Sequence, residues 1–77
     1  MKYVIYVSFP LNTKTMIKDT DDVVRVVGKG HAGAGSDFHM RDVEFQFPTR
    51  KERDDAAKRV KDNFPNHEVL STERRTK

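Results

Sequence analysis

A chain of 77 residues has room for one domain, because a domain needs at least about 50 residues to form its own core. Only 35% of the residues are hydrophobic and 35% are charged, so we expect a thin core under a heavily solvated surface. The absence of cysteine excludes disulfides, thiolate metal ligands and a cysteine nucleophile. The net charge of +3 arises in residues 49–77, where nine Lys and Arg stand against six Asp and Glu.

No segment is apolar for long enough to cross a bilayer. The longest apolar run covers residues 3–7, whereas a membrane-spanning helix needs about 20 residues. This run lacks a small-residue cleavage site, so it is typical of a strand and not of a signal peptide. Together with the lack of cysteine, these features predict a soluble, cytoplasmic protein.

Residues 2–9 predict a central strand, because they are rich in β-branched and aromatic types and both faces are partly apolar. One face consists of Tyr3, Ile5, Val7 and Phe9, and the other of Lys2, Val4, Tyr6 and Ser8.

Residues 11–27 allow two interpretations. Residues 11–21 are polar and fit a loop or a short helix, while residues 22–27 carry four valines in five positions and predict a second strand. The competing helical pattern places apolar side chains at i, i+1, i+7, i+8 and i+11 from Met16 onward. We favour the strand. Residues 28–37 contain all four glycines and predict a turn or flexible loop.

The second half of the chain has clearer patterns. Residues 38–47 alternate between apolar and polar side chains, as a strand with one wet face does. Thr49 and Glu52 form a capping box for a helix over residues 49–63, and residues 67–72 predict a last strand. Residues 1–72 then form one domain, and residues 73–77 a polar tail. We expect an α+β fold in which one main helix crosses a four-stranded antiparallel sheet, ferredoxin-like if residues 11–21 are helical.

The glycine segment formally matches G-x-G-x-x-G from Gly28 to Gly33. A dinucleotide site needs a helix to begin at the last glycine, but a strand is expected there, and no Gly-Lys-Ser/Thr follows. A smaller role is to bind an anion: Lys29 and the glycine amides, with Gly30, His31 and Ser36, can form a nest for a phosphate.

Enzymatic activity is not expected. His31, Ser36 and Asp37 share one glycine-rich loop, which lacks the rigidity that a catalytic triad demands. The spacing of His31, Asp37, His39 and Asp42 matches no metal-ligand pattern. We therefore predict no catalytic residues, no metal and no cofactor.

Binding is the expected function. RNA or another phosphate-rich ligand is the first partner we consider, contacted without strong sequence preference. The residues expected to contact phosphates are Lys29, Arg50, Lys61, Arg74 and Arg75. The alternative is a protein-binding inhibitor or adaptor of the kind that phages and plasmids encode, which uses the open sheet face or a strand edge. The acidic side chains of Asp42 and Glu44 on the wet face oppose binding to phosphate.

Self-association is also expected. The core is thin and has no disulfides, and Val4 and Tyr6 lie on the sheet face that the helix does not need. These features predict a homodimer or a larger assembly in which that face is the interface.

Overall fold

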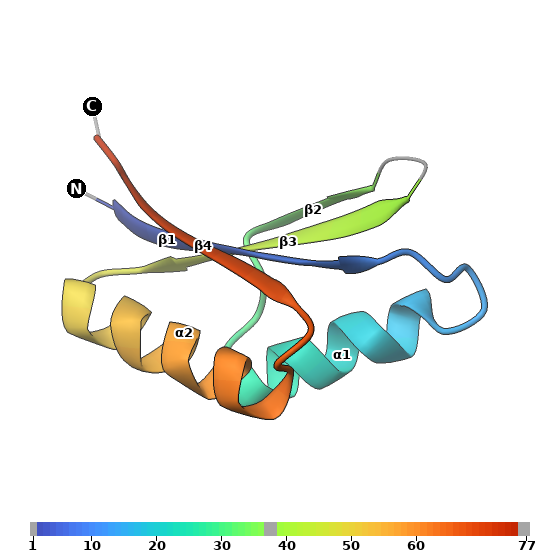
Figure 1. Ribbon diagram of the computed structural model, residues 1–77. Coiled ribbons are helices and arrows are strands. Elements are labelled where there is room, and N and C mark those ends of the chain that lie inside the picture. Colours follow the sequence, from blue (N-terminus) through green and yellow to red (C-terminus); the bar gives the residue numbers. More distant parts are fainter. Residues whose placement is uncertain (1, 37–38, 76–77) are drawn as a thin grey trace.

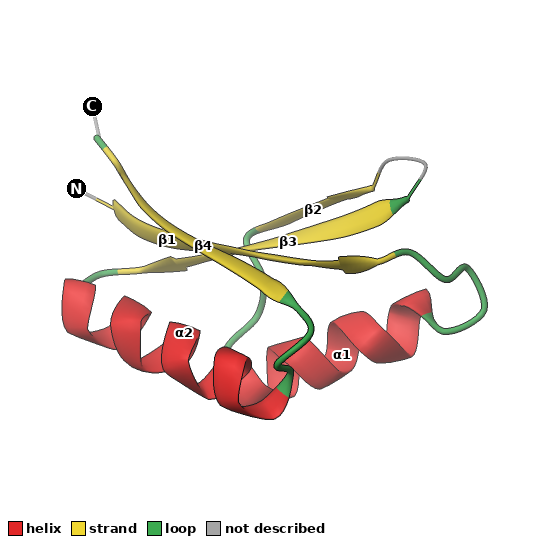
Figure 2. Ribbon diagram, viewed as in Figure 1, coloured by secondary structure: helices red, strands yellow, loops and turns green. Residues whose placement is uncertain are grey.

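A computed structural model describes residues 2–36 and 39–75, and within them the chain forms six elements (Figure 1). In chain order these are β1 (Lys2–Pro10), α1 (Met16–Val27), β2 (Gly33–Ser36), β3 (Met40–Phe47), α2 (Arg50–Asn63) and β4 (Glu68–Arg74). The four strands form one open sheet, and both helices lie on the same side of it (Figure 2). The expected α+β class is confirmed.

The strands lie in the order β2-β3-β1-β4, and all neighbours are antiparallel. β1 is therefore central, as its two partly apolar faces predict, and it pairs along its length with β3 on one side and β4 on the other. The order β-α-β-β-α-β with this strand arrangement is the ferredoxin-like split β-α-β fold. The sequence left this fold conditional on a first helix, and that helix is present.

The prediction of a strand at residues 22–27 is wrong, because these residues form the second half of α1. Thr20, Val23 and Val27 recur at helical spacing and are buried against the sheet, which outweighs the weak intrinsic β preference of valine. Gly28 ends the helix in the left-handed conformation, with φ of 85°, and its N–H donates to the Val24 carbonyl at 2.9 Å. Only glycine takes this conformation without steric strain.

The fourth strand comes instead from the glycine segment, which is expected to be a turn or loop. Gly33–Ser36 pairs with β3, and the Ala32 N–H extends the pairing with a bond of 2.7 Å to the Glu44 carbonyl. Glycine and alanine weaken a strand because they offer little side chain to pack. The hydrogen-bonding groups of β3 compensate for this weakness, so β2 exists only as a partner of its neighbour.

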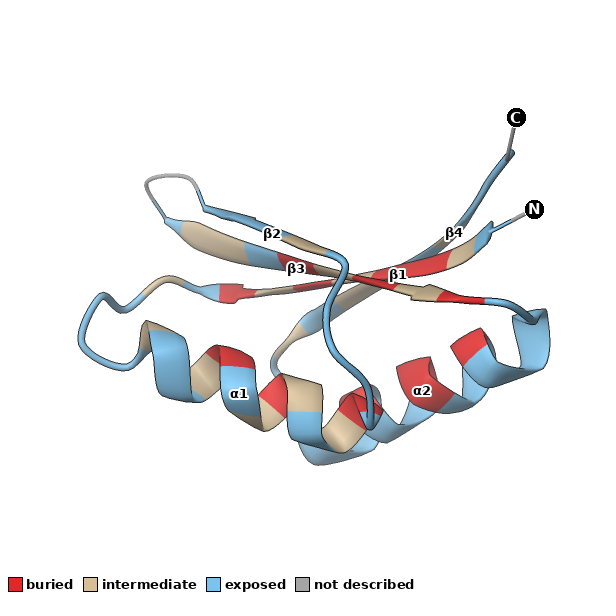
Figure 3. Ribbon diagram, turned by 180° about the vertical axis from the view of Figure 1, so that it is seen from behind, coloured by how far each residue is buried: buried red, intermediate tan, exposed pale blue. Residues whose placement is uncertain are grey.

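The core lies between the sheet and the two helices (Figure 3). It combines the two apolar strand faces predicted from alternation with the apolar stripe of α2, and α1 adds two valines. Its buried members are Ile5, Val7, Phe9, Val23, Val27, Val43, Phe45, Phe47, Ala56, Ala57 and Val60. Phe64 continues the apolar stripe of Ala56, Ala57 and Val60 at the end of α2 and is half-buried against this cluster.

α2 begins as the capping box predicts, since the Glu52 N–H donates to the Thr49 hydroxyl at 3.2 Å. Arg53 is buried on this helix, which its sequence context does not reveal. Its guanidinium donates to the Thr72 carbonyl at 3.0 Å and pairs with Asp54 at 2.9 Å. Arg53 therefore ties α2 to the far end of β4, which runs through Arg74, beyond the expected start of the tail at residue 73.

His67 closes the end of the core beside β4. Its ring stacks against Phe9 and Phe64, with centroids 4.9 Å and 4.8 Å apart. Burial lowers the pKa of His67 below its ordinary value, and the nearby Asp19 carboxylate opposes that effect. The side chain therefore acts as a neutral aromatic ring in the packing. No helix in the described part of the chain is long and apolar enough to cross a membrane.

We predict that Phe45→Ala lowers the free energy of unfolding by about 3–5 kcal/mol, because the ring is fully buried and its loss leaves a cavity. A domain of this size has little stability beyond that, so the variant is largely unfolded at room temperature. Urea denaturation followed by circular dichroism measures the difference. The matched control is Ile17→Ala on the 74% exposed Ile17, which should change stability by less than about 0.5 kcal/mol. Equal effects of the two substitutions would contradict the core assignment.

Candidate functional site: the open sheet face

The sheet face opposite the helices is uncovered in the described part of the chain, and we call it the open face. It displays the even-numbered residues of β1, β3 and β4 and the odd-numbered residues of β2, because opposed residues in antiparallel strands point the same way. Its members with accessible surface include Lys2, Tyr6, Ser8, Gly33, Gly35, Asp42, Glu44, Glu68, Leu70 and Arg74.

Tyr6 lies at the middle of the open face and forms a network with three neighbours. Arg74 Nη2 donates to the Tyr6 hydroxyl, and its guanidinium carbon lies 5.7 Å from the centre of the Tyr6 ring. The same guanidinium pairs with Glu44 at 2.9 Å, and the Gln46 amide donates to Glu44 at 2.7 Å. The phenol and the carboxylate are thus held in fixed positions.

The same contacts lower the pKa of Glu44 below its ordinary value. The hydrogen bond from Gln46 has the largest effect, and Arg74 and the Tyr6 hydroxyl add to it. Partial burial acts in the opposite direction and is outweighed. Glu44 therefore stays ionised on the open face over the whole physiological pH range.

Two shallow hollows flank Tyr6. The larger, of about 560 Å³, is lined by Tyr6, Ser8, Asp42, Glu68, Val69 and Leu70. The smaller, of about 230 Å³, lies over β2, where Gly33 and Gly35 bear no side chains. A Cβ atom built at either glycine meets no other atom within 4 Å, so the hollow exists because those side chains are missing.

The charge of this region is mainly negative. Asp42, Glu44 and Glu68 line the two hollows, and Arg74 is the cation that reaches them through Glu44. Asp42 accepts a hydrogen bond of 2.6 Å from the neutral Ser8 hydroxyl, and within residues 2–36 and 39–75 no salt bridge to Asp42 is found. Leu70 adds an apolar side chain that is 63% exposed. The arrangement suits a cationic group next to apolar atoms.

The two residues expected at a self-association interface behave differently. Tyr6 is half-buried and presents its ring to the hollows. Val4 lies on the same strand face but is fully buried, between Gln46 of β3 and Thr72 of β4 in the pairing register. Val4 therefore offers no surface to a partner.

The structure does not gather the five cations expected to contact phosphates. Lys29 follows α1, Arg50 and Lys61 lie near opposite ends of α2, and Arg74 lies on the other side of the sheet. Arg75 comes directly after β4 and is exposed. A helix rises about 1.5 Å per residue, so the eleven positions between Arg50 and Lys61 separate them by roughly 16 Å.

Several of these cations already have partners inside the molecule. Arg50 pairs with Glu73 at 2.9 Å, and Arg74 pairs with Glu44. Lys29 Nζ donates to the Gln46 carbonyl and lies 4.9 Å from the centre of the Phe47 ring. These contacts anchor strands and loops, and they reduce the charge available to a ligand.

The residues of the expected anion loop also separate. Gly30 and His31 lie in the exposed connection between α1 and β2, whereas Ser36 is the last residue of β2, opposite Arg41 of β3. The pairing of β2 with β3 extends the chain and carries Ser36 away from the other two. Asp37, which shares the glycine-rich segment with His31 and Ser36 in the sequence, lies outside the described residues.

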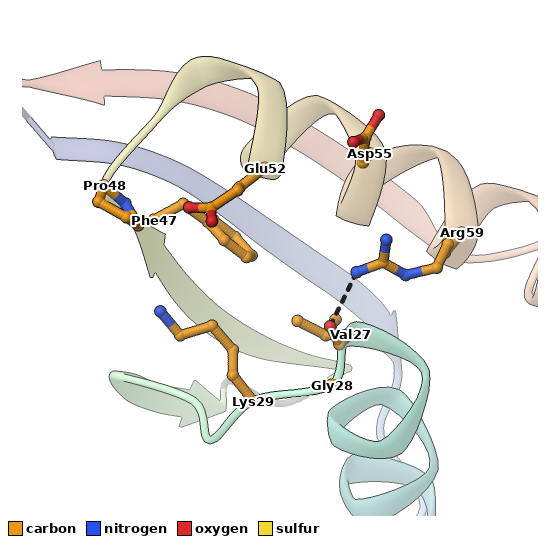
Figure 4. A pocket seen from close by; sticks show the side chains of 8 residues that line it. All are labelled: Val27, Gly28, Lys29, Phe47, Pro48, Glu52, Asp55 and Arg59. Atoms are coloured by element: carbon orange, nitrogen blue, oxygen red, sulfur yellow. Dashed lines mark hydrogen bonds between the residues drawn. The ribbon is translucent and has the colours of Figure 1, made fainter.

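A third hollow, of about 410 Å³, lies where α1, β3 and α2 meet (Figure 4). Arg59 crosses from α2 and donates to the carbonyl oxygens of Val26 and Val27 at 3.2 Å and 2.9 Å, so it caps the end of α1. Glu52 extends toward Phe47, whereas Asp55 points away from the other labelled side chains. The two cations of this hollow are engaged in holding the fold together, so we interpret it as a structural junction.

Within residues 2–36 and 39–75, no group of three or more His, Cys, Asp or Glu side chains could hold a metal ion. Comparisons with protein-family models, curated proteins and solved structures find no match to this chain. The open face is therefore interpreted from its own chemistry.

We predict that Glu44 makes the free energy of unfolding decrease as the pH falls into the acid range. Its pKa is lower in the folded state than its ordinary value of about 4.5, so its stabilising effect is complete above that value and is lost as the pH falls through the folded-state pKa. Urea unfolding from about pH 6 to about pH 3 should show a steeper loss of stability for the wild type than for Glu44→Gln. In a titration followed by NMR, Gln46→Ala and Arg74→Ala should each raise the pKa of Glu44, because each removes a contact that favours the carboxylate. An unchanged pKa in both variants would contradict the network described here.

Proposed function

We propose that this protein is a non-enzymatic binding module, an inhibitor or adaptor, whose open face holds a segment of another protein that carries Lys or Arg between apolar residues. The observation that carries the proposal is the combination of uncompensated carboxylates with exposed apolar surface around Tyr6. A partly apolar, charged surface is typical of a protein interface.

Charge complementarity supports a basic partner. Asp42 and Glu68 line the larger hollow without a cation among its lining residues, so an incoming ammonium or guanidinium group meets negative charge there. Opposite charges steer association and suppress partners of the wrong sign. The same carboxylates repel the phosphates of a nucleic acid.

The contact between Arg74 and Tyr6 shows which chemistry this face already accommodates. A guanidinium group lies beside the phenol ring and reaches a carboxylate on the neighbouring strand. Cations bind the faces of aromatic rings. A carboxylate nearby adds Coulombic attraction for the same cation. A Lys or Arg from a partner finds a similar environment beside Tyr6, between Asp42 and Glu68.

The nucleic-acid alternative has less support. Its expected contacts lie on both sides of the sheet, and two of them are paired with carboxylates. Binding to a phosphate backbone draws its affinity from several cations that act on one path.

We predict that Gly35→Val weakens binding of a basic peptide by about tenfold, because the valine side chain fills the hollow over β2. The substitution does not disturb the fold, since the added Cβ meets no atom within 4 Å and valine favours a strand. The probes are labelled peptides of about six residues, an ordinary strand length, in which Lys alternates with Val, beside versions with Glu in place of Lys. Fluorescence anisotropy measures the affinity, and amide chemical shifts map the contact.

The matched control is Gly30→Val, at a glycine that also has open space around it but lies in the connection before β2. It should bind the Lys peptides as the wild type does. The proposal is wrong if the Glu peptides bind as tightly as the Lys peptides, or if the shift changes avoid Tyr6, Asp42 and Leu70.

A salt titration separates the two partner classes. We expect a labelled single-stranded oligonucleotide to bind weakly, with a slope of log affinity against log salt shallower than about −1. A slope between about −2 and −4 that flattens by one to two units in Arg74→Ala/Arg75→Ala would show phosphate contacts and favour the nucleic-acid alternative.

A further inference from the structure

We propose that the free edge of β4 pairs with β4 of a second copy, antiparallel and centred on Ser71, so that two chains form a homodimer with one continuous sheet. The proposal concerns the edge of the sheet. It involves Glu68 and Leu70, which also line the open face, but it does not depend on the function proposed for that face.

β4 is an edge strand whose protection consists of three charged side chains, Glu68, Glu73 and Arg74. It spans seven residues at the end of the sheet, and its pairing with β1 runs from Glu68 to Arg74 without a bulge. It contains no proline and no lysine, the residues that most often block an exposed edge. The opposite edge, β2, has only four residues, two of which are glycine, and such a strand specifies its pairing register weakly.

Charge selects one register of self-pairing. Two copies related by a two-fold axis at Ser71 pair all seven residues, and they place Glu68 opposite Arg74 of the second copy at both ends. Both side chains lie on the open face, so each pair brings opposite charges together on one side of the sheet. The register with the most backbone pairing is therefore also the register with complementary charges.

The backbone and the apolar side chains agree with this register. It pairs even-numbered residues with even-numbered ones and odd with odd, so the N–H and C=O groups that point away from β1 meet their counterparts. Leu70, which is 63% exposed, comes to lie opposite Thr72 of the second copy, next to the axis. Pairing therefore covers one of the two large hydrophobic side chains that the described chain leaves exposed.

The neighbours of the edge leave room for a second strand. Arg53 donates to the Thr72 carbonyl from the helix side, and a carbonyl oxygen has a second lone pair for a strand partner. The Arg74 side chain is 49% exposed, and a guanidinium group has five donors. Arg74 can therefore keep its pair with Glu44 of its own chain while it also pairs with Glu68 of the second copy.

Cysteine substitutions test the register directly, because the chain has no cysteine of its own. Opposed residues of antiparallel strands have Cα atoms about 4.5–5.5 Å apart, within the range of a disulfide. Ser71→Cys should form a disulfide-linked dimer under mild oxidation. Leu70→Cys and Thr72→Cys should each stay unlinked alone and should link when mixed. Linking at Leu70 alone or at Thr72 alone would overturn the register.

Charge reversal tests the interaction without a covalent bond. Glu68→Arg and Arg74→Glu should each weaken homodimerisation by about tenfold or more, since each opposes like charges at two symmetric positions. A mixture of the two variants should form a heterodimer, because both charged pairs are then complementary. Circular dichroism confirms that each variant is folded. A mixture that associates no better than its components would overturn the proposal.

Sedimentation equilibrium decides whether the dimer forms at all. Leu70→Lys should shift the equilibrium toward the monomer, and the matched control Ile17→Lys, on the outside of α1, should not. A monomer mass for the wild type up to about 1 mM would remove the proposal. Gly35→Val should dimerise as the wild type does, so failure of the peptide experiment and failure of dimerisation are distinguishable.

Discussion

Both helices cover the same face of the sheet, and the remaining features of the molecule follow from that constraint. The connections β1-α1-β2 and β3-α2-β4 each join parallel strands across one intervening strand. Crossovers of this kind are right-handed. The second crossover starts from a strand that runs in the opposite direction, and it moves across the sheet in the opposite direction. The two reversals cancel, so both helices lie on the same side of the sheet. One sheet face therefore becomes the core boundary, and the other remains a surface of side chains set by strand register alone.

This arrangement divides the charges of the chain in a way that its net charge does not show. The cations include several that serve the fold: Arg53 ties α2 to β4, Arg59 caps α1, and Lys29 lies across the end of β3. The carboxylates of Asp42 and Glu68 instead stand on the open face without such a role. A chain with a basic excess can thus place several carboxylates together on one sheet face, because net charge says nothing about where the charges lie.

The candidate site was only partly predictable. Alternation in residues 2–9 and 38–47 placed Tyr6, Asp42 and Glu44 on one wet face, and that placement is correct. The hollow over β2 was not predictable, because it depends on glycines that form a strand only beside β3. The burial of Val4 was also out of reach, since it depends on the strands that flank β1 in the sheet, β3 and β4, which come much later in the chain.

Local patterns determined the elements whose own residues are sufficient: the alternation of β1 and β3, the capping box and apolar stripe of α2, and the α+β class. Tertiary structure decided the secondary structure of residues 16–36. Four valines favour a strand by intrinsic preference, but the burial of Val23 and Val27 against the sheet stabilises a helix by more than that preference. Gly33–Ser36 has almost no preference of its own and becomes a strand because β3 offers unpaired backbone groups. In both segments the deciding energy comes from contacts between residues distant in the chain, which local pattern does not contain.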